Sequence, residues 1–393
     1  MKIRVGVLFG GMSVEHEVSV ISGLQAYHAI PRDKYEPVPI YITKTGQWYT
    51  GEAIGSMDEY KDIPGLLKKS ANVTLQTNEN GAHQLIATKT SWFKKPVVGE
   101  IDVAFPVTHG TFGEDGALQG ILEFQKVPYV GCDVLSSALG MDKVVMKAVV
   151  RSAGLPVVDF ATFYSHQWSE DPEGCIREAE AQLKYPVIVK PANLGSSVGI
   201  ETASDTEQLK GALSNAFTFA DKVIIERLVR NLKEVNCSVI GDHESVETSV
   251  TEEVLKTDEI LSYQDKYMNQ ASKGMSGTNR IIPADISPEL TKEVESLAKR
   301  TFLELGCNGV SRIDFLIDQD EGKVYVNEIN TIPGSLAFYL WEPKGKRFDQ
   351  MTAQLIQLAL KRHRTKSQLT FSYDTNLLAM QGKGGGSKKL GGR

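Results

Sequence analysis

Arg312-Ile-Asp-Phe-Leu-Ile-Asp318, followed by Val324-Tyr-Val-Asn-Glu-Ile-Asn330, is the stretch of sequence that decides the fold. Two apolar runs joined by a polar, glycine-containing turn predict two short adjacent strands. Asp314 lies in the first run, and Glu328 and Asn330 share one face of the second because strand side chains alternate. Two carboxylates and an amide are oxygen ligands that suit Mg²⁺. A hairpin that merely turns polar residues to water is the simpler alternative, but carboxylates so deep in apolar segments argue against it.

The composition is that of an ordinary soluble globular protein. The chain has 393 residues, 41% hydrophobic and 23% charged, which suggests two or three domains. A net charge of -6 argues against a nucleic-acid partner. The four cysteines lie far apart without Cys-x-x-Cys spacing, so we expect no zinc site, no disulfides and a cytoplasmic location. The apolar stretch at the N-terminus is too short for a signal peptide and no apolar run is long enough to span a bilayer, so we expect neither a signal peptide nor membrane association.

The N-terminal sequence predicts an α/β unit. Residues 3–9 read as a buried strand, followed by a glycine turn and a helix that begins near Glu15, with Ser13 as its N-cap. The polar stretch 44–96 reads as a hairpin-rich excursion, and residues 101–107 as a second buried strand. The remaining expected elements are helices at 117–125, 138–153, 287–305 and 346–362, and strands at 187–190, 198–200, 223–226, 234–240 and 246–254.

Val187-Ile-Val-Lys-Pro-Ala-Asn-Leu-Gly-Ser-Ser-Val-Gly199 is a candidate phosphate-binding motif. Lys190 ends a buried strand, which is unfavourable unless it meets a negative partner. The glycine–serine turn after it offers backbone N–H groups and hydroxyls that would grip nucleotide phosphates. The motif is not a Walker A sequence. A hairpin with a snorkelling lysine is the structural alternative.

Other polar residues are candidates whose simpler explanation is an ordinary surface or turn position. Lys143 lies near a helix start and would be a second phosphate contact, with Lys147 one turn further on. Glu226 and Glu234 would accept hydrogen bonds from adenine and ribose. The loop from His109 to Gly116 holds three glycines in eight residues, which permits close backbone approach to a ligand. His109 would orient or deprotonate a substrate.

Two charged residues complete the candidate site. Glu15, where the first strand meets the first helix, would attract a substrate ammonium. Arg312 shares a strand face with Asp314 and would stabilise charge on a transferring group, unless it forms a structural ion pair with Glu328.

These motifs together resemble the D-alanine–D-alanine ligases of the ATP-grasp superfamily, from residue 3 to about residue 335. The most specific segments are 10–19, 109–120, 137–143, 189–199 and 312–334. The resemblance implies a fold that is α/β and α+β, with an N-terminal parallel α/β domain and a nucleotide held between the central and C-terminal domains. The expected divisions are 1–131, 132–228, 229–365 with a lid loop at 256–280, and a flexible tail at 366–393.

The resemblance also implies roles for individual residues. ATP contacts would be Lys143, Lys190, Ser196, Ser197, Glu226, Val229 and Glu234, and two Mg²⁺ or Mn²⁺ ions would be held by Asp314, Glu328 and Asn330. The catalytic residues would be Glu15, Ser196, Tyr267, Arg312 and Gly334, and further substrate contacts would be His109, Lys266, Ser335 and Tyr339. The implied reaction forms D-alanyl phosphate from ATP and D-alanine, which a second D-alanine then attacks, in cell-wall precursor synthesis. A homodimer is expected on the same basis.

The segment Ser335-Leu-Ala-Phe-Tyr-Leu-Trp341 departs from the family's Thr-Ser-His-Ser-like run, which contacts the second substrate. The acceptor is therefore open at this point, with D-serine and D-lactate as alternatives to D-alanine. Tyr267 matches the members that use an amine acceptor. A non-catalytic nucleotide-binding regulator is the alternative from another class, and it fits less well because Lys190 and the metal ligands are present. The base that deprotonates the attacking amine is not identified by the sequence.

Overall fold

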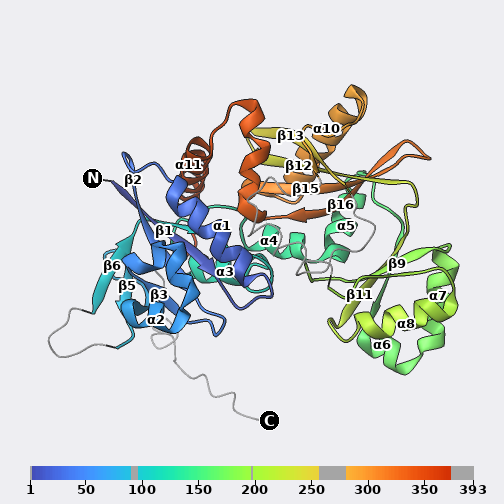
Figure 1. The fold of residues 1–393 in the computed structure, drawn as a ribbon, viewed down its shortest axis with the longest axis horizontal. Coiled ribbons are helices and arrows are strands. Elements are labelled where there is room, and N and C mark those ends of the chain that lie inside the picture. Colours follow the sequence, from blue (N-terminus) through green and yellow to red (C-terminus); the bar gives the residue numbers. More distant parts are fainter. Residues whose placement is uncertain (1, 90–95, 196–197, 256–279, 373–393) are drawn as a thin grey trace, which may run out of the picture.

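The computed structural model of the protein describes residues 2–89, 96–195, 198–255 and 280–372, and it builds them around three β-sheets (Figure 1). The N-terminal sheet has seven strands, the second has four and the third has five. Each sheet has helices of its own, and apolar side chains from the strands and helices form the cores.

The N-terminal sheet has the strand order β6-β5-β4-β3-β2-β1-β7. Strand β1 is parallel to both of its neighbours, β2 and β7, whereas the other neighbouring strands pair antiparallel. The expected parallel arrangement thus holds for three strands, and the hairpins expected in the stretch 44–96 include β3, β4 and β5, which extend the same sheet. The bounds are β1 Ile3–Gly10, β2 Tyr35–Ile42, β3 Trp48–Thr50, β4 Ala71–Thr77, β5 His83–Ala87, β6 Val97–Ile101 and β7 Val103–Pro106, with helices α1 His16–Ala29, α2 Ile63–Lys69 and α3 Ala117–Phe124.

The start of α1 differs from the expectation. Ser13 is not the N-cap, because its Oγ accepts a hydrogen bond of 3.0 Å from the Glu15 N–H, before the helix begins. Glu15 occupies the N-cap position, and its side chain makes no capping hydrogen bond. The positive φ angles of Gly10 (91°) and Gly11 (107°) turn the chain sharply after β1 and delay the helix start. The Glu15 carboxylate is thereby placed at the sheet's carboxyl edge.

The second sheet has the order β10-β9-β11-β8 and is antiparallel throughout. Its strand β10 begins at Glu201 and not at Val198 as expected, since Gly199 with φ +71° forms a turn there. The bounds are β8 Phe160–Tyr164, β9 Val187–Pro191, β10 Glu201–Ala203 and β11 Lys222–Arg227, with helices α6 Ser165–Glu170, α7 Pro172–Gln182 and α8 Thr206–Ala216.

The third sheet has the order β14-β13-β12-β15-β16 and is also antiparallel. The predicted hairpin at 310–330 forms its β15 and β16. The bounds are β12 Leu232–Gly241, β13 Val246–Val254, β14 Arg280–Ile281, β15 Gly309–Asp318 and β16 Lys323–Asn330, with α10 Pro288–Glu304, the 3₁₀ segment η4 Gly334–Leu340 and α11 Phe348–Ser367. Helix α11 thus ends two residues beyond 365, the last residue expected before the tail.

The single helix expected at 138–153 is two helices, α4 Val134–Met141 and α5 Lys143–Ser152. They break at Asp142, whose carboxylate caps α5 by accepting hydrogen bonds from the Val144 and Val145 N–H groups. Met146 and Val150 of α5 belong to the same core as Phe315 of the third sheet. Helix α5 therefore lies on this sheet, and its first residue contacts the segment after β9 of the second sheet, since the Lys143 N–H donates to the Ala192 carbonyl at 2.9 Å.

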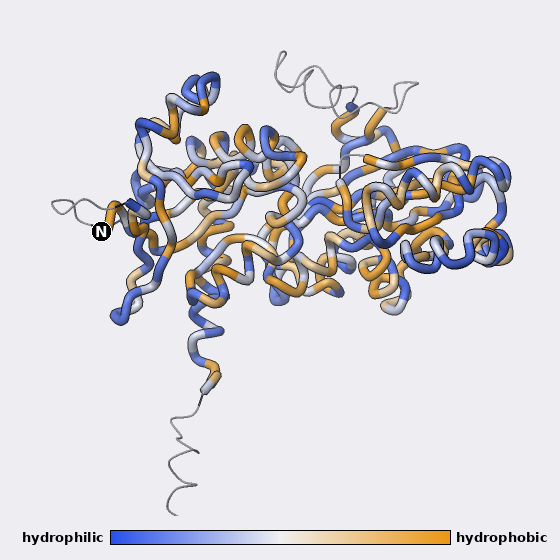
Figure 2. Tube along the Cα trace, turned by 90° about the horizontal axis from the view of Figure 1, so that it is seen from below, coloured by the Kyte–Doolittle hydropathy of each residue, from blue (hydrophilic) through white to orange (hydrophobic). Residues whose placement is uncertain are grey.

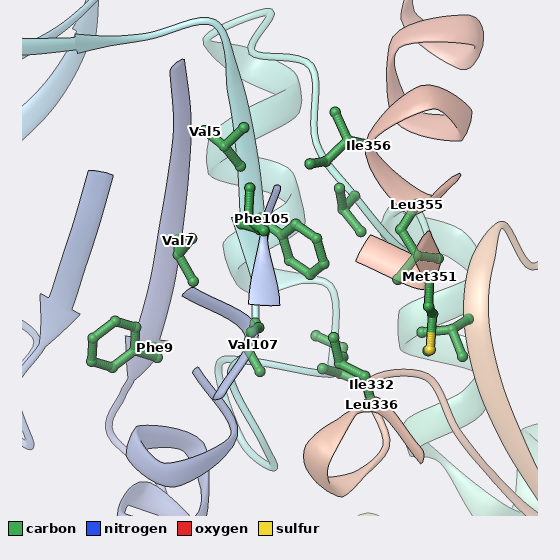
Figure 3. Packing of buried hydrophobic residues seen from close by; sticks show 14 of the residues in the cluster. Val5, Val7, Phe9, Phe105, Val107, Ile332, Leu336, Met351, Leu355 and Ile356 are labelled. Atoms are coloured by element: carbon green, nitrogen blue, oxygen red, sulfur yellow. The ribbon is translucent and has the colours of Figure 1, made fainter. Parts of the chain in front are cut away.

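The N-terminal sheet and the C-terminal helix share one core (Figure 3). Phe105 and Val107 lie at the end of β7, and Ile332, Leu336 and Met351 pack in the same cluster. Ile332 and Leu336 follow β16 directly, so this packing fixes the loop after the hairpin against the N-terminal domain.

Hydrophobic and hydrophilic residues are interspersed along the described chain (Figure 2). Among the described residues, no helix combines the length and apolar character needed to cross a bilayer. All four cysteines are buried and free.

Candidate active site

The β15–β16 hairpin brings its polar side chains together. Asp314 pairs with Glu328 and Arg312 with Asn330 across the two strands, so all four lie on one face. Arg312 donates two hydrogen bonds to Asp314, at 2.8 and 2.9 Å, and Asn330 donates to the same carboxylate at 3.1 Å. Arg312 therefore forms its ion pair with Asp314. The alternative expectation, a structural ion pair with Glu328, is wrong.

A β-bulge in the hairpin adds a residue that the sequence did not indicate. The register shifts after the Asp314–Glu328 pair, and Phe315 pairs with Val326, so Asn327 is the extra residue. The bulge turns its side chain toward the second sheet, where Asn327 Oδ1 lies 3.5 Å from Lys190 Nζ. The predicted phosphate-binding lysine and the predicted metal site thus meet in one place.

Lys190 is buried and forms part of a three-residue charge cluster. Its Nζ lies 2.5 Å from Glu226 Oε2, and Lys147 Nζ lies 2.7 Å from Glu226 Oε1. Burial acts to raise the pKa of Glu226, but the two ammonium groups outweigh it and lower the pKa to about 2. Lys147 has no exposed side-chain surface, and burial lowers its pKa.

Lys143 links the second sheet to the hairpin. Its Nζ donates a 2.8 Å hydrogen bond to the Leu194 carbonyl and lies 3.4 Å from Glu328 Oε2. Its backbone N–H donates to the Ala192 carbonyl at 2.9 Å. The start of α5 is therefore fixed to the glycine–serine segment after β9, next to the candidate metal ligands.

Glu15 lies between two glycines, Gly110 after β7 of the N-terminal sheet and Gly195 after β9 of the second sheet. A Cβ at Gly110 would come 2.8 Å from Glu15 Oε2 and 2.5 Å from Ser13 Oγ. A Cβ at Gly195 would come 3.3 Å from both carboxylate oxygens of Glu15. Side chains at either position would crowd the carboxylate, so both glycines permit a close approach that other residues would hinder.

His109 and Glu114 connect the glycine-rich loop to the loop after β16. His109 Nε2 lies 3.0 Å from Ser22 Oγ, which also accepts a 2.9 Å hydrogen bond from the Ser335 N–H. Glu114 accepts from the Gly110 N–H at 2.8 Å and from the Ile332 N–H at 2.9 Å. Burial and the nearby charge of Glu15 raise the pKa of Glu114 to about 8.

The segment that departs from the family pattern is strained and partly buried. Ser335, Leu336 and Ala337 have φ angles of 50°, 53° and 52°, in the left-handed region that L-residues rarely adopt. Further along, the Tyr339 hydroxyl donates to Glu252 Oε2 at 3.0 Å, and Arg280 Nη1 lies 3.0 Å from Glu252 Oε1. Burial acts to lower the pKa of Arg312, but the charges of Asp314, Tyr339 and Glu252 outweigh it and raise this pKa, so Tyr339 and Glu252 lie near the guanidinium.

The donor set of the hairpin suits a hard divalent cation. Burial acts to raise the pKa of Glu328, but the charges of Lys143, Lys190 and Arg312 outweigh it and hold this pKa below its ordinary value. For Asp314, burial raises the pKa and the Arg312 guanidinium opposes the shift. The described residues contain no group of three or more His, Cys, Asp or Glu side chains that could enclose a metal by themselves. Two carboxylates and an amide fit Mg²⁺ if phosphate oxygens and waters complete the shell.

The other predicted residues are placed as follows. Val229 is buried in the connection between β11 and β12, and Glu234 on β12 lies near enough to Lys190 for their charges to interact. Gly334 opens η4. Four predicted residues lie outside the described part of the chain: Ser196, Ser197, Lys266 and Tyr267.

Sequence reasoning assigned no role to four residues that the structure brings to the site, namely Lys147, Asn327, Glu114 and Glu252. Lys147 lies one helical turn after Lys143, so both lie on one helix face. This spacing is a sequence signal that Lys147 lies near the site. Glu114 is part of the glycine-rich loop that the sequence analysis had singled out. No local signal marked Asn327 or Glu252.

Comparison with known proteins gives consistent matches over both halves of the chain. The families described as "D-ala D-ala ligase N-terminus" and "D-ala D-ala ligase C-terminus" match residues 4–132 and 149–357. D-alanine--D-alanine ligases of Thermosipho melanesiensis and Thermosipho africanus are 39% and 40% identical, each over 96% of this chain and 99% of the relative.

Solved structures agree with these matches. The structure of the D-alanine-D-alanine ligase from Coxiella burnetii superposes with a TM-score of 0.78 at 29% identity, covering 93% of this chain and 96% of the other. The VanG D-Ala:D-Ser ligase from Enterococcus faecalis superposes with a TM-score of 0.76 at 32% identity, covering 91% of this chain and 100% of the other. The fold class predicted from the sequence is thereby confirmed.

Proposed function

The chain belongs to the D-alanine–D-alanine ligase family, and from this premise we propose how its residues perform the reaction. The protein is an ATP-dependent ligase that joins two D-alanines for peptidoglycan precursor synthesis. One observation carries the assignment of residues. Lys143 and Lys190, which would contact phosphates, lie within 3.5 Å of Glu328 and Asn327 on the hairpin that bears the metal ligands.

In the first step, the carboxylate of one D-alanine attacks the γ-phosphate of ATP, and ADP leaves. Glu15 would hold the ammonium of this D-alanine, because a carboxylate in a closed site attracts a cation strongly. Lys143 and Lys190 would face the phosphates and offset their charge, so positioning and electrostatics do most of the work. Gly110 and Gly195 support this arrangement, since they let both loops approach Glu15 closely.

In the second step, the neutral amine of the other D-alanine attacks the carbonyl of the acyl phosphate, the C–O bond to phosphate breaks, and the proton lost by the nitrogen ends on the released phosphate as hydrogen phosphate. Arg312 and the backbone N–H of Gly334 would stabilise the oxyanion of the tetrahedral intermediate. His109, Ser335 and Tyr339 would line the second substrate's site, which the hydrogen bonds through Ser22 support. Lys266, Tyr267, Ser196 and Ser197 would close the site and exclude water, which would otherwise hydrolyse the acyl phosphate.

Asp314, Glu328 and Asn330 would hold two Mg²⁺ or Mn²⁺ ions. When bound, such ions offset the negative charge of the phosphates and orient them. Glu226, Glu234 and the backbone near Val229 would bind adenine and ribose.

We also propose a cytoplasmic homodimer. Phe124 and Leu135, with exposed fractions of 88% and 65%, support a subunit interface formed by α3 and α4, which pack against each other. Light scattering after size-exclusion chromatography would give about twice the chain mass for a dimer, and one chain mass would exclude it.

The function is tested by ADP formation that requires both D-alanine and a divalent cation, with mass spectrometry of the product. Purified protein is incubated with ATP, D-alanine and equal amounts of D-serine and D-lactate. We expect D-alanyl-D-alanine as the main product. A mixed dipeptide or an ester as the main product would reject D-alanine as the preferred acceptor, and ADP formation without any amino acid would reject ligation.

A further inference from the structure

Lys147 is a buried lysine to which the reaction described above gives no role. Its side chain has 0% exposed surface, and its Nζ lies 2.7 Å from Glu226 Oε1. An ammonium removed from water destabilises the fold unless it meets a counter-ion. Glu226, with 1% exposed side-chain surface, already has Lys190 within 2.5 Å, so neutralising this carboxylate does not require a second lysine.

The two lysines approach Glu226 from different elements and contact different oxygens. Lys190 lies on β9 opposite Ile224 of β11, which makes it a diagonal neighbour of Glu226 on the adjacent strand. Lys147 comes from α5, whose neighbouring side chains Met146 and Val150 are anchored in the core of the third sheet. Lys190 Nζ is also 3.5 Å from Asn327 Oδ1 and therefore lies beside the proposed phosphate site. The Lys147 side chain, in contrast, has no exposed surface.

This asymmetry matters if Lys190 contacts phosphate. An ammonium drawn toward a phosphate weakens its ion pair with Glu226, and removal of one partner from a buried pair strongly disfavours the remaining charge. With Lys147 in place, Glu226 keeps a counter-ion whichever way Lys190 turns. An ionised carboxylate is also a stronger acceptor than a neutral one for the N–H of an adenine amine.

We propose that Lys147 is a positioning residue for nucleotide recognition, which keeps Glu226 ionised and directed at the exocyclic amine of adenine while Lys190 serves the phosphates. The inference rests on the proposed function, because it requires Glu226 and Lys190 to contact ATP. It predicts that Lys147 acts on the choice of base although it does not touch the nucleotide.

The test compares ATP with inosine triphosphate, which carries a carbonyl oxygen where ATP carries the amine. Lys147→Met keeps the side-chain length without the charge, and Lys147→Gln is a second variant that keeps a donor in case the methionine variant does not fold. Arg151→Met on the same helix is the matched control, since Arg151 lies 3.7 Å from Asp159 and is 46% exposed. For each protein, kcat/KM is measured with both nucleotides at saturating D-alanine.

We expect the KM for ATP to rise at least about ten-fold in Lys147→Met, and the preference for ATP over inosine triphosphate to fall by a similar factor. Arg151→Met should keep the wild-type preference. In a Glu226→Gln background, Lys147→Met should change the preference no further, because the group through which Lys147 acts is gone. A general packing defect would lower kcat/KM equally for both nucleotides and leave the preference unchanged.

An unchanged preference in folded Lys147 variants would overturn the inference, and so would a wild type that does not distinguish the two nucleotides. Both results require a wild type that turns over with D-alanine. A wild type without D-alanine-dependent turnover would instead contradict the proposed function. The two failures are therefore distinguishable.

Discussion

Gly110→Ala tests whether the glycine-rich loop positions Glu15. The φ of Gly110 is +72°, so alanine adds backbone strain of roughly 1–2 kcal/mol. The new Cβ would also lie 2.8 Å from Glu15 Oε2 and 2.5 Å from Ser13 Oγ. Restoring an ordinary contact of 3.4 Å moves these atoms by about 0.6 and 0.9 Å, and misplacements of about 1 Å cost about 100-fold in rate. We expect kcat/KM for D-alanine to fall at least about ten-fold.

Gly154→Ala is the matched control for this prediction. Gly154 has the same φ of +72°, but no atom lies within 4 Å of its Cβ position, so only the backbone strain is shared. Gly195→Ala should give an intermediate loss, since its Cβ would lie 3.3 Å from the Glu15 oxygens. The assay is initial-rate ADP formation against D-alanine concentration, with thermal unfolding measured in parallel. If Gly110→Ala and Gly154→Ala lowered kcat/KM equally, Glu15 would not depend on Gly110.

Three further changes address other parts of the site. Asp314→Asn should lower turnover at least about 100-fold, because a metal ligand is lost. The same change should destabilise the fold by about 3–5 kcal/mol, because it leaves the buried Arg312 without its partner. Wild-type turnover of this variant would reject Asp314 as a ligand. Glu226 has a folded-state pKa of about 2, below the value of about 4.3 for a free glutamate, so its ionised form stabilises the fold by roughly 3 kcal/mol at neutral pH. This stabilisation is present above about pH 4 and is lost as the pH falls toward 2. The difference between wild type and Glu226→Gln in the free energy of unfolding by urea should therefore roughly halve near pH 3. A difference that stays constant with pH would contradict the assigned charge of Glu226. Tyr339→Phe removes the hydrogen bond to Glu252 and should raise the KM for the second D-alanine a few-fold while leaving the KM for ATP unchanged, which substrate titrations would check.

The elements of the site were predictable where the signal is local. The apolar runs of the sequence predict β15 and β16, and the alternation of side chains predicts the shared face of Glu328 and Asn330. The register of the two strands adds Asp314 to that face. Glycine density identified the loop after His109, and a strand-ending lysine identified Lys190. Each of these signals is contained in a few consecutive residues, so the sequence alone carries it.

The parts that the sequence did not predict depend on contacts between distant segments. The bulge at Asn327 is a matter of strand register, and the sequence does not indicate which residue leaves the ladder. Lys147 lies on α5, which packs on the third sheet, whereas its partner Glu226 lies on β11 of the second sheet. The break between α4 and α5 is different, because Asp142 is a recognisable capping residue and its signal was local.

The charges of the site are arranged as cation–anion pairs that connect separate elements. Arg312 pairs with Asp314 within β15, Lys143 of α5 with Glu328 of β16, and Lys190 of β9 with Glu226 of β11. Buried charges left single would destabilise the fold strongly, so pairing is what permits a cluster of this density to exist. The same pairing has a consequence for binding. Glu226 keeps Lys147 when Lys190 turns to a phosphate, so the consequence falls on the pair of Lys143 and Glu328. A phosphate that attracted Lys143 and a cation that attracted Glu328 would each weaken this pair, unless both arrived together and replaced the lost partners. At the proposed site, joint binding of nucleotide and metal would therefore be favoured over binding of either alone, because only joint binding would give both Lys143 and Glu328 a new partner.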